Sequence, residues 1–166
     1  MVAVGGLSQA QLDEHFLRHA FEIARRSMGN GNHPFGAILV DRNRKVLIET
    51  ENGYLPARDR TAHAERALAT EACRTLSADA LAAATIYSSA EPCAMCSGAI
   101  YWAGIGRLVY GLSEARLRGL TGNHPENPTL DLPCRAVFAS GQRLTEVIGP
   151  LLEDEAAALH AGAWNK

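Results

Sequence analysis

Residues 88–104 read SSAEPCAMCSGAIYWAG and place two cysteines three positions apart, directly after a proline. ATIYSS (84–89) predicts a short buried strand, and the proline with the closing glycine predicts a helix over 92–104. A strand that leads straight into a helix is typical of α/β folds. The chain has four cysteines in all. Three roles therefore compete for this pair: a disulfide, half of a structural zinc site, or part of a metal site that does chemistry.

The segments on either side continue this strand-and-helix pattern. Ser8 and Gln11 form a capping-box pattern that predicts a helix ending at Gly29. Thr61 is the expected N-cap of a second long helix, and mostly loop is expected over 113–132. Further strands are expected in PFGAILVD (34–41), KVLIET (45–50), RLVYG (107–111) and LTEVIG (144–149), and short helices in 132–140 and 150–161. This alternation indicates one α/β sandwich around a sheet of about five strands.

Composition limits the class of protein. The 166 residues are 47% apolar and 20% charged, as in a single globular domain over 1–166. No apolar run approaches the roughly 20 residues of a membrane span, and the N-terminus lacks a signal-peptide pattern. We therefore expect a cytoplasmic protein with no membrane partner and reduced cysteines, which weakens the disulfide interpretation. A net charge of −2 with scattered basic residues argues against a nucleic acid partner.

A second motif, TAHAE (61–65), supplies further donors for a metal. His63 is expected in the first turn of its helix, where the helix dipole favours a neutral imidazole. Cys93 and Cys96 are expected near the start of the other helix, where the same dipole stabilises thiolates. One imidazole and two thiolates suit Zn²⁺.

The number of ligands separates a structural zinc site from a catalytic one. A structural site needs four protein ligands, and Cys73 and Cys134 are poorly placed to be the fourth. A catalytic site needs three ligands and keeps a position for water. Glu65, two residues after the histidine, can move a proton from that water to a leaving amine. The pattern favours a catalytic zinc.

His-x-Glu followed by Pro-Cys-x-x-Cys is the signature of zinc deaminases that act on nucleobases. HPFGAILV, TAHAE, EPCAMCSGAIYWAG and GRLVYG follow one another over about residues 10–112, and in this the chain resembles the cytidine deaminase-like superfamily. The resemblance implies a three-layer α-β-α sandwich with a mixed five-stranded sheet. It also implies one zinc ion per chain, with bound water or hydroxide, on His63, Cys93 and Cys96, and Glu65 as the catalytic proton shuttle.

Within that superfamily, SAEPC and GAIYWAG are most similar to bacterial guanine deaminase and related nucleoside deaminases. This implies release of ammonia from a free nucleobase or nucleoside, with a guanine-type amino-purine favoured. Other amino-purines, pterins, triazines and cytosine-like rings stay open. The alternative is a tRNA-specific adenosine deaminase. The C-terminal LLEDEAAALHAGAWNK lacks a basic tail, which argues against an RNA substrate. A third alternative, a zinc-stabilised binding domain without activity, leaves Glu65 without a role.

Four residues are expected to contact the heterocyclic amine: Asn52, Phe35, Trp102 and Glu91. Asn52 is alternatively a turn residue, and a tryptophan on a helix is more often found in a core or an interface. Ring-edge candidates in 113–132 are Glu114, Asn123, His124 and Glu126, and His33 and His160 are interpreted as surface and structural residues. Members of the superfamily are generally dimers or larger, with pockets sometimes completed by a neighbour's C-terminal segment. We therefore expect a homodimer.

Overall fold

The computed structural model describes residues 6–122 and 124–164. In chain order the elements are α1 (Gln9–Gly29), β1 (Gly36–Val40), β2 (Val46–Glu51), α2 (Ala64–Thr75), α3 (Ala78–Ala82), β3 (Thr85–Ala90), α4 (Ala94–Ala103), β4 (Arg107–Leu112), α5 (Glu114–Thr121), α6 (Cys134–Ala139), β5 (Glu146–Ile148) and α7 (Glu153–Ala158). Within these described ranges, no helix combines the length and the apolar character needed to cross a membrane.

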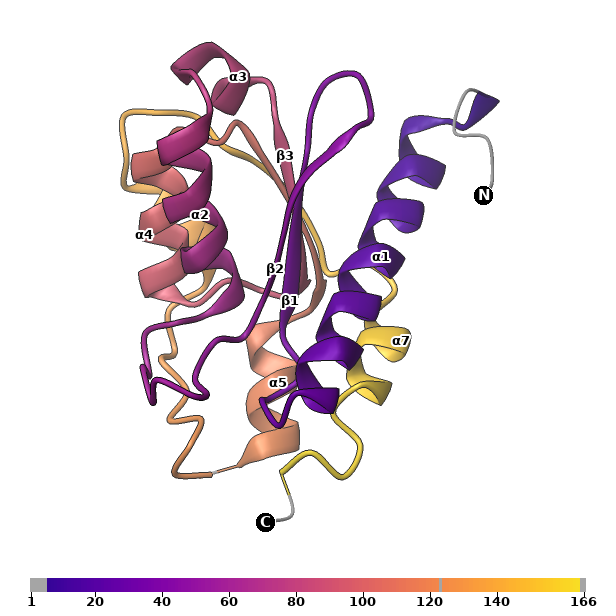
Figure 1. Ribbon diagram of the computed structural model, residues 1–166, viewed down its shortest axis with the longest axis vertical. Helices are drawn as coiled ribbons and strands as arrows, with labels where there is room; N and C mark the ends of the chain where they lie inside the picture. The colour runs from indigo at the N-terminus through magenta and orange to yellow at the C-terminus, as the bar shows by residue number, and fades with distance from the viewer. Residues whose placement is uncertain (1–5, 123, 165–166) are drawn as a thin grey trace.

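The five strands form one mixed sheet in the order β2-β1-β3-β4-β5. β1 is antiparallel to both of its neighbours, whereas β3, β4 and β5 are parallel. Helices α1 and α7 cover one face, and α2 and α4 cover the other (Figure 1). The three-layer α-β-α sandwich with a mixed five-stranded sheet is therefore confirmed.

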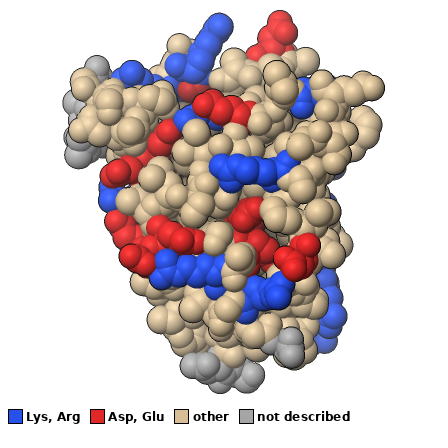
Figure 2. Space-filling model, turned by 180° about the vertical axis from the view of Figure 1, so that it is seen from behind, with Lys and Arg blue, Asp and Glu red and all other residues tan. Residues whose placement is uncertain are grey.

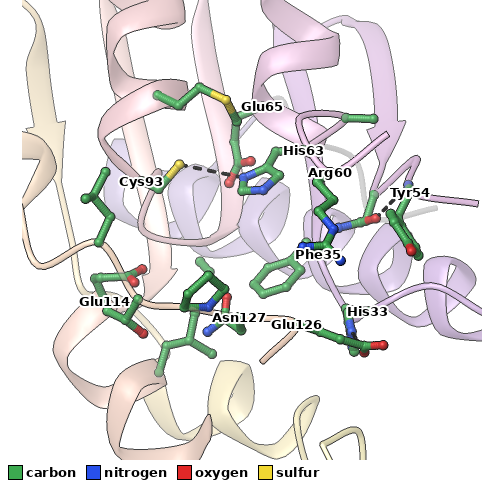
Figure 3. A pocket seen from close by; sticks show the side chains of 18 of the residues that line it. His33, Phe35, Tyr54, Arg60, His63, Glu65, Cys93, Glu114, Glu126 and Asn127 are labelled. Atoms are coloured by element: carbon green, nitrogen blue, oxygen red, sulfur yellow. Dashed lines mark hydrogen bonds and ion pairs between the residues drawn. The ribbon is translucent and has the colours of Figure 1, made fainter. Parts of the chain in front are cut away.

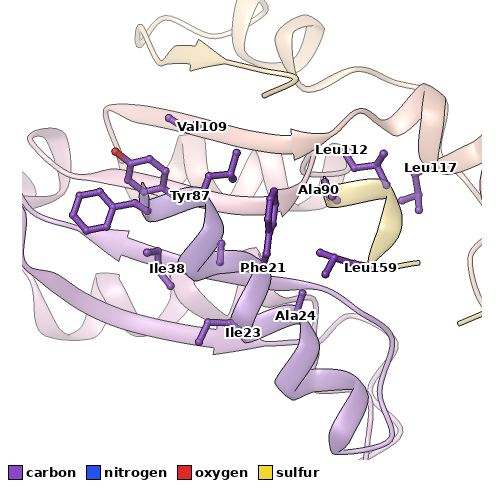
Figure 4. Packing of buried hydrophobic residues seen from close by; sticks show 14 of the residues in the cluster. Phe21, Ile23, Ala24, Ile38, Tyr87, Ala90, Val109, Leu112, Leu117 and Leu159 are labelled. Atoms are coloured by element: carbon purple, nitrogen blue, oxygen red, sulfur yellow. The ribbon is translucent and has the colours of Figure 1, made fainter. Parts of the chain in front are cut away.

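The core is divided by the sheet because successive strand residues point to opposite faces. On β1, Ile38 packs in the cluster beneath α1 and α7, and Leu39 packs in the cluster beneath α2 and α4. On the α1 face, the ring of Phe21 points at the sheet. It lies between Ile38 of β1 and the side chains of Ala90 (β3) and Leu112 (β4) in Figure 4. Burial on both faces explains why β1 is apolar at every position, GAILV.

Helix α1 begins and ends where the sequence predicts. The Ser8 side chain accepts a hydrogen bond from the Gln11 amide, and the Gln11 side-chain oxygen accepts one from the Ser8 backbone N–H. The helix lies directly on β1 at Gly36, where an added Cβ would come within 2.5 Å of the Ala24 nitrogen. The glycine in PFGAILVD therefore permits a close contact between helix and sheet.

The predicted N-cap of α2 is wrong by two residues. Thr61 is not the N-cap, because its amide and hydroxyl both donate to the Asp59 carboxylate and the chain turns there first. The N-cap is His63, in an extended conformation with φ −67° and ψ 148°.

The start of α4 differs in the same way. Pro92 is not the first helical residue, since the first helical hydrogen bond runs from the Ser97 amide to the Cys93 carbonyl. Cys93 is the N-cap, with φ −62° and ψ 171°. Both expected metal ligands at these helix starts therefore precede the first helical turn.

Two further helices were not predicted. The segment after β4, expected to be mostly loop, contains α5, which is capped by Ser113 through the Arg116 amide. The short α3 follows Leu76, whose extended backbone ends α2, and the Ser77 side chain caps it through the Ala80 amide.

Candidate active site

One edge of the sheet collects the expected site residues. Because β1 runs opposite to β2 and β3, and β4 runs parallel to β3, the ends of β2, β3 and β4 lie beside the start of β1. Asn52 follows β2, Glu91 follows β3 and Glu114 follows β4, whereas Phe35 precedes β1. Ligands of open α/β sheets bind at this edge.

Three side chains converge there as a metal-binding cluster. The candidate ligand atoms of His63, Cys93 and Cys96 lie within 4.8 Å of one another, and the Cys93 Sγ is 3.6 Å from the His63 Nδ1. His63 and Cys93 are N-caps that make no side-chain capping bond, so both side chains are free to turn toward each other. Cys96, fully buried, follows in the first turn of α4.

The donor set fits a cation. The hydrogen bond from Cys96 lowers the pKa of the Cys93 thiol to about 4, with His63 adding to the effect. The same bond and the burial raise the pKa of Cys96. The two opposite shifts belong to one interacting pair of thiols, and a bound cation would hold both sulfurs as thiolates. One imidazole and two sulfurs form a donor set that Zn²⁺ accepts, and among the described residues the cluster contains no fourth protein ligand.

Glu65 lies beside this cluster without belonging to it. Its side chain is 5% exposed, and its Oε1 accepts a hydrogen bond of 2.7 Å from the Ser88 hydroxyl. Burial raises the pKa of its carboxyl group, and the neighbouring His63 opposes that shift. A buried carboxyl with a raised pKa, fixed next to a metal-binding cluster, is suited to accept and return a proton.

A cavity of about 350 Å³ opens against the cluster (Figure 3). His63, Glu65 and Cys93 lie on one side of it and the His33–Glu126 pair lies on another, with Phe35 between them in this view. The described residues that line it are His33, Phe35, Asn52, Tyr54, Asp59, Arg60, Ala62, His63, Glu65, Ala90, Glu91, Cys93, Met95, Glu114, Leu117, Pro125, Glu126, Asn127, Pro128, Thr129, Leu130 and Trp164.

Two lining residues have polar groups free for a ligand. The Asn52 Oδ1 already accepts a 3.0 Å hydrogen bond from the Tyr54 amide, so its Nδ2 is left to donate into the cavity. The Glu114 carboxyl has no hydrogen-bond partner among the described residues. Burial raises its pKa to about 7, with the negative charges at Cys93, Glu91 and Glu65 adding to the effect. Glu114 can therefore donate or accept near neutral pH.

The aromatic wall of the cavity includes a residue that the sequence reasoning missed. Trp164, near the C-terminus, stacks on His33 with ring centroids 4.1 Å apart. Its Nε1 donates to the Nδ1 of the buried His160 at 3.1 Å, and the His33 Nε2 lies 2.7 Å from a Glu126 carboxylate oxygen. The pattern HPF preceding β1 and the tryptophan in AGAWNK are 130 residues apart, and no local signal connects them.

Only some of the residues expected to contact the substrate lie together in this cavity. Asn52, Phe35 and Glu91 line the cavity with the cluster. Trp102 does not: it lies on α4 with 82% of its surface exposed, so its expected pocket position is wrong. Of the ring-edge candidates, Glu114 and Glu126 line the cavity, His124 does not, and Asn123 lies outside the described residues.

Comparison with known proteins places this geometry in context. The model of the cytidine and deoxycytidylate deaminase zinc-binding region matches residues 10–112. A probable cytosine deaminase of Schizosaccharomyces pombe is 39% identical over 165 residues, which cover 96% of this chain and 98% of that protein. A tRNA-specific adenosine deaminase of Haemophilus influenzae is 37% identical over 64% of this chain and 61% of its own. The solved guanine deaminase from Nitrosomonas europaea superposes with a TM-score of 0.75 at 26% identity, covering 97% and 95% of the two chains.

Proposed function

The chain belongs to the cytidine and deoxycytidylate deaminase family, and from that premise we propose that it hydrolyses the exocyclic amino group of a free nucleobase, cytosine first. The guanine-type preference expected from GAIYWAG is not confirmed. Guanine remains the second candidate, favoured by the likeness to the guanine deaminase fold.

The extent of the match to the probable cytosine deaminase carries the choice of substrate. Nine of the lining residues follow position 112: Glu114, Leu117, Pro125, Glu126, Asn127, Pro128, Thr129, Leu130 and Trp164. An alignment over 96% of the chain necessarily includes most of these positions. The match to the tRNA-specific enzyme spans only 64% of the chain. The fuller match is the better guide to what the whole pocket recognises.

In the proposed reaction, a C–O bond forms at the amino-bearing ring carbon, the C–N bond breaks, and ammonia leaves. A zinc ion held by His63, Cys93 and Cys96 would supply the Lewis acidity that makes water nucleophilic at neutral pH. Glu65 accepts a proton from the attacking water and returns it to the departing amine. Ser88 fixes the orientation of that carboxyl through its 2.7 Å hydrogen bond.

The remaining pocket residues orient the ring. The free Nδ2 of Asn52 donates to a ring carbonyl or ring nitrogen. Phe35 and Trp164, with centroids 6.2 Å apart at 60°, offer an aromatic corner for the flat face of a base. Glu114, with its pKa near 7, contacts a ring N–H or ring acceptor close to the metal cluster. Cytosine offers both kinds of group on one edge.

Editing of tRNA is the third candidate, and the similarity to the tRNA-specific adenosine deaminase of Haemophilus influenzae favours it. The charge distribution argues against it. On the face shown in Figure 2, basic and acidic side chains interleave, with acidic groups between the basic ones. Contacts to phosphates dominate nucleic acid affinity and favour a continuous basic surface.

Ammonia release from purified, zinc-replete protein tests the proposal. The panel holds cytosine, guanine, adenine, their nucleosides, several pterins and triazines, and a tRNA anticodon stem-loop. We expect turnover of cytosine, absent in Glu65→Ala. Turnover of guanine alone would replace cytosine by the second candidate. Activity on the stem-loop with none on the small molecules would overturn the free-base proposal.

A further inference from the structure

Glu91 occupies an unusual position in the cavity wall. It is 8% exposed, and both of its carboxylate oxygens accept backbone hydrogen bonds. Its Oε2 accepts from the Glu114 amide and its Oε1 from the Cys134 amide, each at 2.9 Å. These amides belong to the first residues of α5 and α6, respectively.

The first amides of a helix have no partner within that helix, and a carboxylate is a favourable acceptor for them. Glu91 thus satisfies two helix starts at once, from a loop two residues before the Cys93 ligand. Its own amide donates to the Leu112 carbonyl at 2.7 Å, at the end of β4. The loop that carries the Cys93 ligand is therefore hydrogen-bonded directly to the backbone of Glu114.

We propose that Glu91 is a positioning residue: by holding the start of α5 against the metal-binding loop, it sets where the Glu114 carboxyl meets the substrate ring. This replaces the direct substrate contact expected from the sequence, and it rests on the proposed deaminase function. A displacement of about 1 Å at a reacting group can cost as much as 100-fold in rate, so such a tether matters to turnover.

The chain offers a matched control for this tether. Glu153 at the start of α7 also holds α5, because its Oε1 accepts from the amide and hydroxyl of Ser113. It does not line the cavity. Glu153→Ala therefore loosens the same helix start from the side away from the metal cluster.

A double-mutant cycle separates positioning from direct contact. Glu91→Ala, Glu114→Gln, the double variant and Glu153→Ala are compared by kcat/KM on the best base of the panel, each with zinc content measured. We expect Glu91→Ala to lose at least about tenfold in kcat/KM with zinc retained. In the Glu114→Gln background the same change should cost less than about twofold, since interacting residues are not additive. Glu153→Ala should stay within about twofold of the parent.

An undiminished Glu91→Ala effect in the Glu114→Gln background would overturn the proposal and restore direct contact with the substrate. If Glu153→Ala lost as much kcat/KM as Glu91→Ala, the proposal would also fail, because Glu91 would then only stabilise α5 and would not position Glu114. Where Glu91→Ala does not fold, Glu91→Gln takes its place, because its amide oxygen accepts from one backbone N–H and its NH₂ opposes the other.

A second readout is independent of turnover. Amide hydrogen exchange at Glu114 should be at least about tenfold faster in Glu91→Gln than in the parent, because the hydrogen bond that protects it is weakened. Unchanged exchange would contradict the tether itself. If the parent chain deaminates no base, the proposed function fails, while this exchange measurement still decides whether Glu91 holds α5.

Discussion

His63 and Cys93 stand at N-caps, positions where Ser, Thr, Asp or Asn normally accepts a backbone hydrogen bond. Neither side chain does so here. Leaving out a cap costs about 0.5–2 kcal/mol per helix. The binding free energy of a metal held by the same side chains is far larger and offsets that loss. At both helix starts, a side chain that would otherwise cap the helix is used to bind the metal.

His160 gives a prediction about pH. It is 4% exposed, its Nδ1 accepts from Trp164, and burial together with the charge of His33 lowers its pKa to about 4. An unfolded histidine titrates near 6.5. Between pH 4 and pH 6.5, His160 binds a proton in the unfolded chain but stays neutral in the folded chain. The contribution of neutral His160 to the free energy of unfolding is therefore fully present above pH 6.5 and declines as the pH falls toward 4.

We expect the wild-type protein to lose about 2 kcal/mol of unfolding free energy through His160 between pH 7.5 and pH 5. His160→Gln should lose correspondingly less over the same range, and His15→Gln, which changes a half-buried histidine of α1, should follow the wild type. Urea unfolding at the two pH values measures this. Equal losses in wild type and His160→Gln would show that His160 is not the group responsible.

The residues show where prediction from sequence succeeds. His63, Cys93 and Cys96 are recognisable because the chemistry of zinc demands these donors at short, fixed spacings, and the structure brings the three together. Trp102 and Trp164 are different. Both sit in helical or near-helical apolar contexts, and only the path of the whole chain decides that Trp164 reaches the cavity and Trp102 faces outward.

Among the elements, α1 and β1 owe their close packing to Gly36. An added Cβ there would meet the Ala24 nitrogen at 2.5 Å and the Ala20 carbonyl oxygen at 2.8 Å. Backbone atoms cannot move aside as a side-chain tip can. We expect Gly36→Ala to lower the unfolding free energy by about 1–3 kcal/mol through overpacking.

Gly98, inside α4, is the matched control, since a Cβ there meets no atom within 4 Å. Replacing a helical glycine by alanine gains up to about 1 kcal/mol. Gly98→Ala should therefore be neutral or stabilising in the same urea titration. If both variants lose similar stability, the close contact between α1 and β1 is not the reason that Gly36 is needed.

Elements with strong local patterns were predicted well, and those without were not. The capping box of α1 and the apolar runs of the strands are local signals, and the structure places these elements as expected. Helix α5 begins in SEARLRGL, in a segment where Pro125, Pro128 and several nearby glycines suggested mostly loop. Besides its Ser113 cap, its start is held by residues distant in sequence: Glu153 accepts from the Ser113 amide and Glu91 from the Glu114 amide.

At the scale of the whole molecule, we predict that two chains associate. Trp102 is 82% exposed and Leu144 is 95% exposed, and large apolar side chains of this kind are common at interfaces. We expect a homodimer, with a mass from light scattering of about twice the 17.8 kDa chain. Trp102→Ser should shift the population toward the single chain. A wild-type mass near 17.8 kDa would contradict this expectation.

We propose that the cluster of His63, Cys93 and Cys96 serves chemistry, with Glu65 as the group that moves the proton. The most direct test is the turnover of Glu65→Ala on the base that the wild type deaminates, using protein with one zinc per chain. Removing a general acid–base group costs about 10²–10⁴ in rate, so we predict a kcat at least about 100-fold lower with zinc retained. Near-normal turnover in that variant would contradict the assignment.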